Sequence, residues 1–149
     1  MEIENINKRV LYEENGVAAY LTPAPNSKMS FAEILQKDVP KDAQGNLVPH
    51  TIVEKSVIPT DREFREGWEY KGGAIVTSFI KAKDITKDRL RVERTPLLAE
   101  QDILFMKAQE AGASTTAIVA EKNRLRDITT LADGATTTDE LKALKVGVA

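Results

Sequence analysis

A long helical pattern constrains this 149-residue chain more than any other feature. Apolar residues recur at helical spacing over residues 80–111, Gly112 interrupts the pattern, and a second helical pattern covers 115–129. Glycine favours the left-handed backbone that ends a helix, and Ser114 is a residue type that caps the next one. Two helices joined by so short a turn should pack antiparallel, so residues 80–132 are predicted to form a helical hairpin.

The apolar residues of the first predicted helix fall into two sets. One set forms a stripe wide enough to be buried: Leu97, Leu98, Leu104, Phe105, Ala108 and Ala111. Ile103 and Met106 lie outside this stripe, and such a surplus indicates a second contact, within the fold or with another chain. Thr95-Pro96 interrupts the helical pattern, so either a new helix begins with Thr95 as its cap or the helix bends there.

Residues 1–79 are predicted to form a β-rich unit. Asn15-Gly16 separates two apolar runs at 8–13 and 17–22, and such a pair favours a hairpin turn. Gly72-Gly73 gives a second hairpin signal. Capping-box patterns beginning at Ser30 and at Thr60 predict two short helices, and residues 51–57 read as a third strand.

Four residues after Thr60 are predicted to anchor this unit. Phe64 and Trp68 are four residues apart and are expected to pack a short helix, ending near Gly67, onto the sheet. Arg62 and Arg65 are expected to hold the preceding loop by charge-assisted hydrogen bonds, with a contact to another protein as the alternative role.

Residues 133–149 are predicted to be a polar linker and a short C-terminal helix. A capping box at Thr137 starts that helix, which carries Leu141 and Leu144, and the last four residues are expected to fray unless they dock on a partner. These two leucines join Ile103 and Met106 as hypothetical interface residues. The predicted fold class is α+β: a small antiparallel β unit, an antiparallel helical pair and a short terminal helix, which can together form one domain.

Composition argues against most kinds of chemistry. The chain has 21 Lys and Arg against 23 Asp and Glu, so no strong overall field attracts nucleic acid or an anionic membrane. It has no cysteine and a single histidine, His50, so a metal site would need carboxylates alone beside that imidazole. The sequence also lacks the glycine-rich loops that bind phosphate, and it lacks an apolar run long enough to span a membrane. We expect a soluble, intracellular protein without metal or cofactor, and not an enzyme.

A basic stripe is the main candidate for a charged contact. Lys83, Lys87, Arg91 and Arg94 follow one another at four and three residues, so they share a helix face that could contact a phosphate backbone or another anionic partner. Asp84 and Asp88 lie at pairing distance, and no aromatic residue is interleaved for base stacking. We therefore favour a salt-bridged outer face and regard nucleic-acid binding as the alternative.

Four segments resemble a known group of proteins: residues 58–68, 81–91, 98–108 and 120–128, which read IPTDREFREGW, KAKDITKDRLR, LAEQDILFMKA and AEKNRLRDI. In this order they are similar to small proteins that tailed bacteriophages and prophages encode among their virion and tail genes. The likeness spans roughly residues 50–145. Leu-Arg-Asp-Ile at the end of the last segment also resembles the end of tail-fibre assembly proteins.

The resemblance implies a virion structural or assembly protein of the tail or its fibres. Such a protein would be made in the host cytoplasm, reside in the virion and act without catalytic residues. Its partners would be other phage structural proteins, or further copies of itself in a homo-oligomer. The alternative function is that of a nucleic-acid-binding accessory protein that uses the basic stripe.

Overall fold

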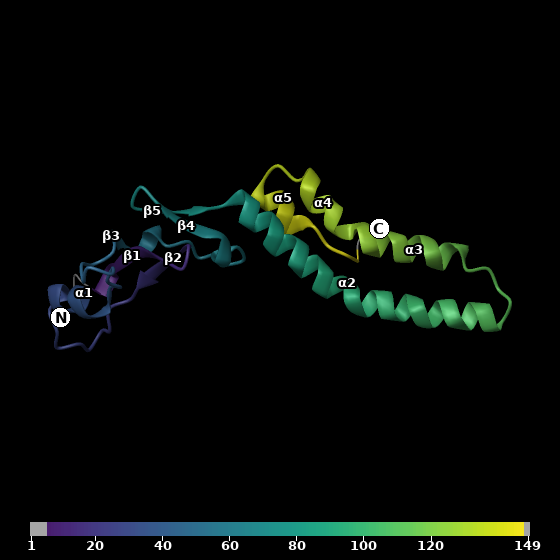
Figure 1. The fold of residues 1–149 in the computed structure, drawn as a ribbon, viewed down its shortest axis with the longest axis horizontal. Helices are drawn as coiled ribbons and strands as arrows, with labels where there is room; N and C mark the ends of the chain where they lie inside the picture. The colour runs from purple at the N-terminus through teal and green to yellow at the C-terminus, as the bar shows by residue number, and fades with distance from the viewer. Residues whose placement is uncertain (1–5, 148–149) are drawn as a thin grey trace. The chain divides into compact units, whose positions relative to one another are not determined.

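The computed structural model describes residues 6–147, and the contacts of the chain divide it into two units, Met1–Ser78 and Phe79–Ala149. Antiparallel strands form the centre of the first unit and helices form the second (Figure 1). The predicted α+β class is therefore confirmed. The segment 133–147 belongs to the helical unit.

The first unit is built on a three-stranded antiparallel sheet in the order β2-β1-β3. Strand β1 (Lys8–Glu14) pairs with β2 (Val17–Leu21) on one side and with β3 (His50–Glu54) on the other. Asn15 and Gly16 connect β1 to β2 with positive φ angles of 52° and 78°. Asparagine and glycine tolerate this backbone better than other residues, which explains why the predicted hairpin forms here.

The third strand is shorter than predicted. It ends at Glu54, which pairs with Lys8 at the beginning of β1, and the chain continues as the short 3₁₀ helix η2 (Lys55–Val57). Backbone amides of a strand need partners on a neighbouring strand. Because β1 offers none beyond Lys8, the predicted strand over 55–57 is wrong.

The two capping-box predictions in this unit have different outcomes. Helix α1 (Phe31–Asp38) carries the predicted box, in which Ser30 Oγ accepts from the Glu33 amide at 3.3 Å. The one- or two-turn helix predicted to begin at Thr60 does not begin there: the chain forms only the 3₁₀ helix η3 (Arg65–Gly67), which ends at the predicted Gly67.

A local hydrogen bond explains the missing helix. The Asp61 side chain accepts from the Glu63 amide at 3.0 Å. Such a short side-chain turn offers the backbone an alternative to helical hydrogen bonds.

A second hairpin, β4 (Trp68–Lys71) and β5 (Ala74–Thr77), completes the unit. Its turn, Gly72-Gly73, has two positive φ angles, as the sequence predicts. The hydroxyl groups of Thr51 and Tyr70 hydrogen bond at 2.6 Å and join this hairpin to β3. Within the described part of the unit, the hydrophobic core contains Val10, Leu11, Ala18, Ile34, Val39, Phe64 and Trp68.

The second unit begins with the 32-residue helix α2 (Phe79–Glu110), which contains Pro96. The sequence left open whether a new helix starts at this proline, and the structure shows one helix that changes direction near its middle (Figure 1). Proline removes one backbone hydrogen bond and crowds the preceding turn. Next to it, Thr95 Oγ1 donates to the Arg91 carbonyl at 2.8 Å, within the same helix.

The chain then returns beside α2 through α3 (Thr116–Asp127), the 3₁₀ helix η4 (Ile128–Thr130), α4 (Leu131–Gly134) and α5 (Thr138–Ala143) (Figure 1). The predicted helix over 115–129 and the predicted capping box at Thr137 are present, but α4 occupies part of the predicted linker.

The core of this unit lies at one end of the hairpin. Leu90, Leu125, Ile128 and Val146 form a buried cluster against which Leu97, Leu98 and Leu144 pack. In the described part of the unit, every buried residue falls within 82–90 or 125–146. The core therefore combines the first part of α2 with the C-terminal segments.

Candidate interaction surface

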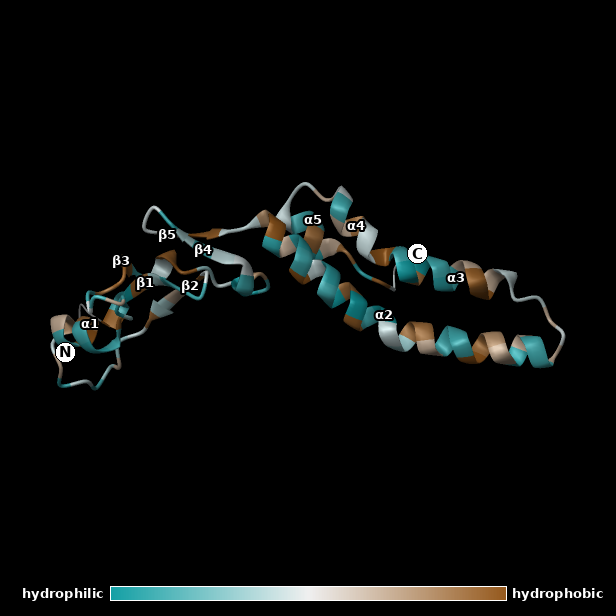
Figure 2. Ribbon diagram, in the orientation of Figure 1, coloured by the Kyte–Doolittle hydropathy of each residue, from teal (hydrophilic) through white to brown (hydrophobic). Residues whose placement is uncertain are grey.

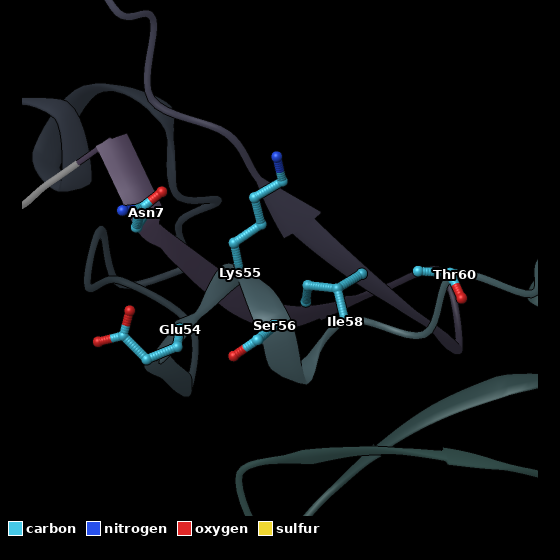
Figure 3. A pocket seen from close by; sticks show the side chains of 6 residues that line it. All are labelled: Asn7, Glu54, Lys55, Ser56, Ile58 and Thr60. Carbon is cyan, nitrogen blue, oxygen red and sulfur yellow. The ribbon is translucent and has the colours of Figure 1, made fainter.

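Two adjacent hollows mark the surface of the first unit, and residue 55 lines both of them. One, of about 450 Å³, is lined by Asn7, Glu54, Lys55, Ser56, Ile58 and Thr60 (Figure 3). The other, of about 290 Å³, includes Arg9, Tyr20, Thr22 and Arg62 in its lining. In Figure 3 the Lys55 side chain extends away from Glu54, whose carboxylate pairs instead with Lys8. The carboxylate of the first hollow is therefore engaged in an ion pair.

The single histidine lies in strand β3, opposite Tyr12 of β1. Nδ1 of His50 donates to the Val48 carbonyl at 2.8 Å, so one ring nitrogen is engaged with the backbone. Burial raises the pKa of the Tyr12 hydroxyl, and the charges of Glu14 and Asp38 act in the same direction. Within residues 6–147, no three histidine, aspartate or glutamate side chains come close enough to hold a metal ion.

The predicted anchor residues of the first unit separate into two kinds. Phe64 and Trp68 are buried, with exposed fractions of 4% and 2%. Arg62 and Arg65 are both exposed, and Arg62 contributes to the smaller hollow. The predicted charge-assisted hydrogen bonds of these two arginines remain a prediction.

The first half of the basic stripe contacts α4. Lys87 forms an ion pair with Asp133 at 2.7 Å, and Lys83 Nζ donates to the Asp133 carbonyl at 3.4 Å. Lys83 also lies 5.0 Å from the ring centre of Phe79. The hydrogen bond from Lys87, together with the positive charges of both lysines, lowers the pKa of the Asp133 carboxyl. These two lysines therefore help to join α2 to α4.

The second half of the stripe also makes contacts within its own unit. Arg91 forms an ion pair with Asp88 at 2.5 Å on the same helix. Arg94 donates to the carbonyl of Leu125 at 3.3 Å and to that of Arg126, at the end of α3. A stripe whose charges are used in this way has less positive potential to offer a phosphate backbone.

Two hypothetical interface residues of the C-terminal helix belong to the core of their own unit. Leu141 is fully buried, and Leu144 is half-buried against the cluster of Leu90, Leu125 and Val146. The assignment of Leu141 and Leu144 to an interface with another protein is therefore corrected. The prediction of a frayed end is also wrong at Val146, which is 2% exposed; residues 148–149 lie outside the described part of the chain.

The distal part of the helical hairpin differs from the rest of its unit. The structure describes all of residues 91–124, and none of them is buried. Ile103 and Met106, which the sequence singled out, are 50% and 56% exposed. Leu104, which was predicted to lie in the buried stripe, is 47% exposed. Figure 2 shows hydrophobic bands along α2 almost to its end. This distal hairpin, residues 91–124, is the candidate interaction surface.

Few strong contacts join the two arms of the distal hairpin. Lys122 on α3 forms an ion pair with Asp102 on α2 at 2.5 Å and lies 5.1 Å from the ring centre of Phe105. Arg124 binds Glu121 along α3 at 2.7 Å, and this hydrogen bond lowers the pKa of the Glu121 carboxyl. The contacts of Lys122 and a number of half-buried apolar residues align the two arms, and none of the residues 91–124 is buried.

Sequence reasoning missed the arginines that bind backbone carbonyls. Arg89 and Arg124 bind carbonyls of the C-terminal segment, yet a lone arginine at helical spacing reads as a solvated charge. A weak signal was available, since Arg89 shares a face with apolar Ala82 and Ile85.

No helix within residues 6–147 is both long enough and apolar enough to span a membrane. Comparisons of this chain with protein-family models, curated proteins and solved structures found no match.

Proposed function

We propose that this chain is a structural or assembly protein of a tailed bacteriophage, associated with the tail or its fibres, and that it works through protein–protein contacts. The four segments that resemble phage virion proteins support the phage setting. The observation that carries a contact function is the distal hairpin, in which none of the residues 91–124 is buried.

A two-helix hairpin of this kind gains little from its own packing. Helices in proteins derive most of their stability from burying an apolar face, and short isolated helices are marginal in water. Ile103 and Met106 are each half exposed or more, and, being three residues apart, they are neighbours on one face of the helix. A contiguous apolar surface on a helix without a core is the kind of surface that other proteins cover.

Mass spectrometry of purified particles of the source phage, compared with lysate of infected cells, tests the proposal. We expect the chain in particles at a fixed number of copies per tail. If it occurs only in lysate, a pull-down should recover a tail or fibre protein with it, which would identify an assembly factor. Absence from particles together with no virion protein in the pull-down would overturn the proposal.

Phage that carry altered chains separate the contact surface from the fold. Ile103→Ser with Met106→Ser should lower the number of copies in particles, or the recovery of the virion protein. The matched control is Asp84→Ala, since Asp84 is an exposed residue of α2 that lies outside residues 91–124. Equal incorporation of both variants would argue against the distal hairpin as the contact.

A further inference from the structure

Helix α2 carries an exposed seam that faces away from α3. The seam consists of Pro96, Ala99, Ile103, Met106 and Glu110, which are separated alternately by three and four residues, and all five are exposed. This spacing is the one by which helices pair as coiled coils. Pro96 lies inside α2, and the other four members of the seam follow it on one continuous stretch of the helix.

The seam and the contact with α3 occupy opposite sides of the helix. Successive residues of an α-helix are rotated by roughly 100°, which places the seam within an arc of roughly 80°. Leu98, Gln101, Phe105 and Ala108 are half-buried and lie on the other side. Ile103 and Met106 therefore cannot be covered by α3, because the two helix faces point apart.

We propose that the seam binds the same seam of a second copy of this chain, with the two α2 helices antiparallel. In this register Ile103 of each copy packs on Met106 of the other, and the short side chain of Ala99 lies beside the long side chain of Glu110. The contact is symmetric, so one two-fold axis satisfies both copies. A seam this short predicts reversible association that depends on concentration.

The charges beside the seam favour this orientation. The antiparallel register places Glu100 of one copy next to Lys107 of the other, and symmetry makes this pair twice. A parallel pairing would instead stack Glu110 on Glu110 inside the seam. It would also place Lys107 next to Asp102 of the other copy. That carboxylate is already bound by Lys122 of its own chain at 2.5 Å, so Lys107 would have to compete for it.

Analytical ultracentrifugation of the full chain over a range of concentrations measures the association. We expect a monomer–dimer equilibrium, which Ile103→Ser should weaken by about tenfold or more because each dimer loses two buried side chains. Leu104→Ser is the matched control: Leu104 is 47% exposed against 50% for Ile103, and it lies beside the seam. A monomer at all concentrations, or a larger effect of Leu104→Ser, would overturn the proposal. Circular dichroism at 222 nm verifies that both variants remain folded.

A charge exchange tests the orientation. Glu100→Lys alone and Lys107→Glu alone should each weaken the dimer several-fold, and more strongly at low salt, because each creates two like-charge pairs. The double variant should restore the affinity, since the antiparallel pair is then re-formed with its signs exchanged. Failure of the double variant to recover would contradict the antiparallel register.

The absence of cysteine from the chain makes a second test direct. Chains with Ile103→Cys and chains with Met106→Cys are mixed under a mild oxidant, which joins two thiols as a disulfide. The antiparallel register predicts mainly cross-linked dimers that contain one chain of each kind. A parallel pairing would give mainly dimers of like chains and would overturn the proposal.

The proposed self-association rests on the proposed assembly function, because it names a second copy of the chain as the partner of the same surface. The two fail differently. If the chain is present in particles but is a monomer in solution, and Ile103→Ser does not change its sedimentation, the proposed function stands and the proposed self-association is overturned. If the chain dimerises through the seam but is absent from particles and binds no virion protein, the self-association stands and the proposed function is overturned.

Discussion

Arg89 donates two hydrogen bonds to backbone carbonyls at the end of α5, to Leu141 at 3.0 Å and to Leu144 at 2.9 Å. Arg124 donates in the same manner to the Val146 carbonyl at 3.1 Å. The last carbonyls of a helix have no partner within the helix, and a planar guanidinium can satisfy two at once. These arginines hold the C-terminal segment over the core cluster.

Replacing Arg89 by alanine should lower the free energy of unfolding of the helical unit by about 2 kcal/mol, because two carbonyls lose a charged donor in a half-buried site. Arg91→Ala is the matched control on the same helix. Its side chain is 52% exposed and forms an ion pair with Asp88 on the same helix, so its loss should cost about 0.5 kcal/mol or less. Urea unfolding followed at 222 nm measures both. Equal losses would show that the bonds of Arg89 to α5 contribute nothing.

A carboxylate at the beginning of α5 should make the helical unit sensitive to acid. Glu140 accepts from the Thr136 amide at 2.6 Å and from the Thr136 hydroxyl at 3.0 Å, and these bonds lower its pKa below the ordinary 4.5. A lowered pKa in the folded state stabilises the fold above the unfolded-state pKa. This stability is lost as the pH falls from about 5 through the folded-state pKa.

The melting temperature of the helical unit, recorded at 222 nm between about pH 6 and pH 3, measures this loss. Glu140→Gln should make the curve flatter, since glutamine does not titrate. Asp84→Asn serves as control, because Asp84 is an exposed carboxylate of α2 that lies outside the seam. A curve of Glu140→Gln as steep as that of the unaltered chain would exclude this carboxylate as the cause.

At the scale of the elements, helix α2 contains a residue that destabilises helices. Pro96 lies inside the helix, where it removes the hydrogen bond to the carbonyl four residues earlier. Pro96→Ala should restore that bond and raise the free energy of unfolding of the helical unit by about 1–3 kcal/mol. The measurement is urea unfolding at 222 nm. A decrease instead would show that the bend is needed for α3 to pack beside α2.

Elements that depend on local chemistry were predictable from the sequence. The turns at Asn15-Gly16 and Gly72-Gly73 and the capping boxes at Ser30 and Thr137 follow from conformations that neighbouring residues impose on each other. Strand β3 was predicted too long, because its end is set by where β1 begins, far away in the sequence. The helix expected after Thr60 is replaced by a turn around Asp61.

The candidate site was predictable only in part, for a related reason. Periodicity placed Ile103 and Met106 outside the buried stripe, and both are exposed. The same reasoning assigned Leu141 and Leu144 to an interface, whereas they pack on residues of α2 and α3. Periodicity identifies an apolar face, but the segment that covers it depends on the path of the whole chain.

At the scale of the whole molecule, the two units offer separate probes of stability. The only tryptophan, Trp68, lies in the first unit, so its fluorescence reports on the sheet. The signal at 222 nm comes chiefly from the helices of the second unit. Each unit has its own buried residues, so a core substitution should act on one signal alone.

Phe64→Ala should lower the free energy of unfolding of the first unit by about 3–5 kcal/mol, as expected for a buried aromatic side chain. The fluorescence transition in urea should move to lower concentration, or already be complete in buffer, while the transition at 222 nm stays in place. Arg89→Ala should give the opposite pattern. Parallel shifts of both signals would show that the units unfold together.

The absence of buried residues from 91 to 124 gives the distal hairpin an adjustable length. A seven-residue insertion into α2, matched by one in α3, would extend the hairpin by about 10 Å without altering any residue of the core. The same change within 82–90 or 125–146 would break the packing around Leu90. The length of the hairpin is therefore independent of the core around Leu90, which is the property that a molecular spacer requires.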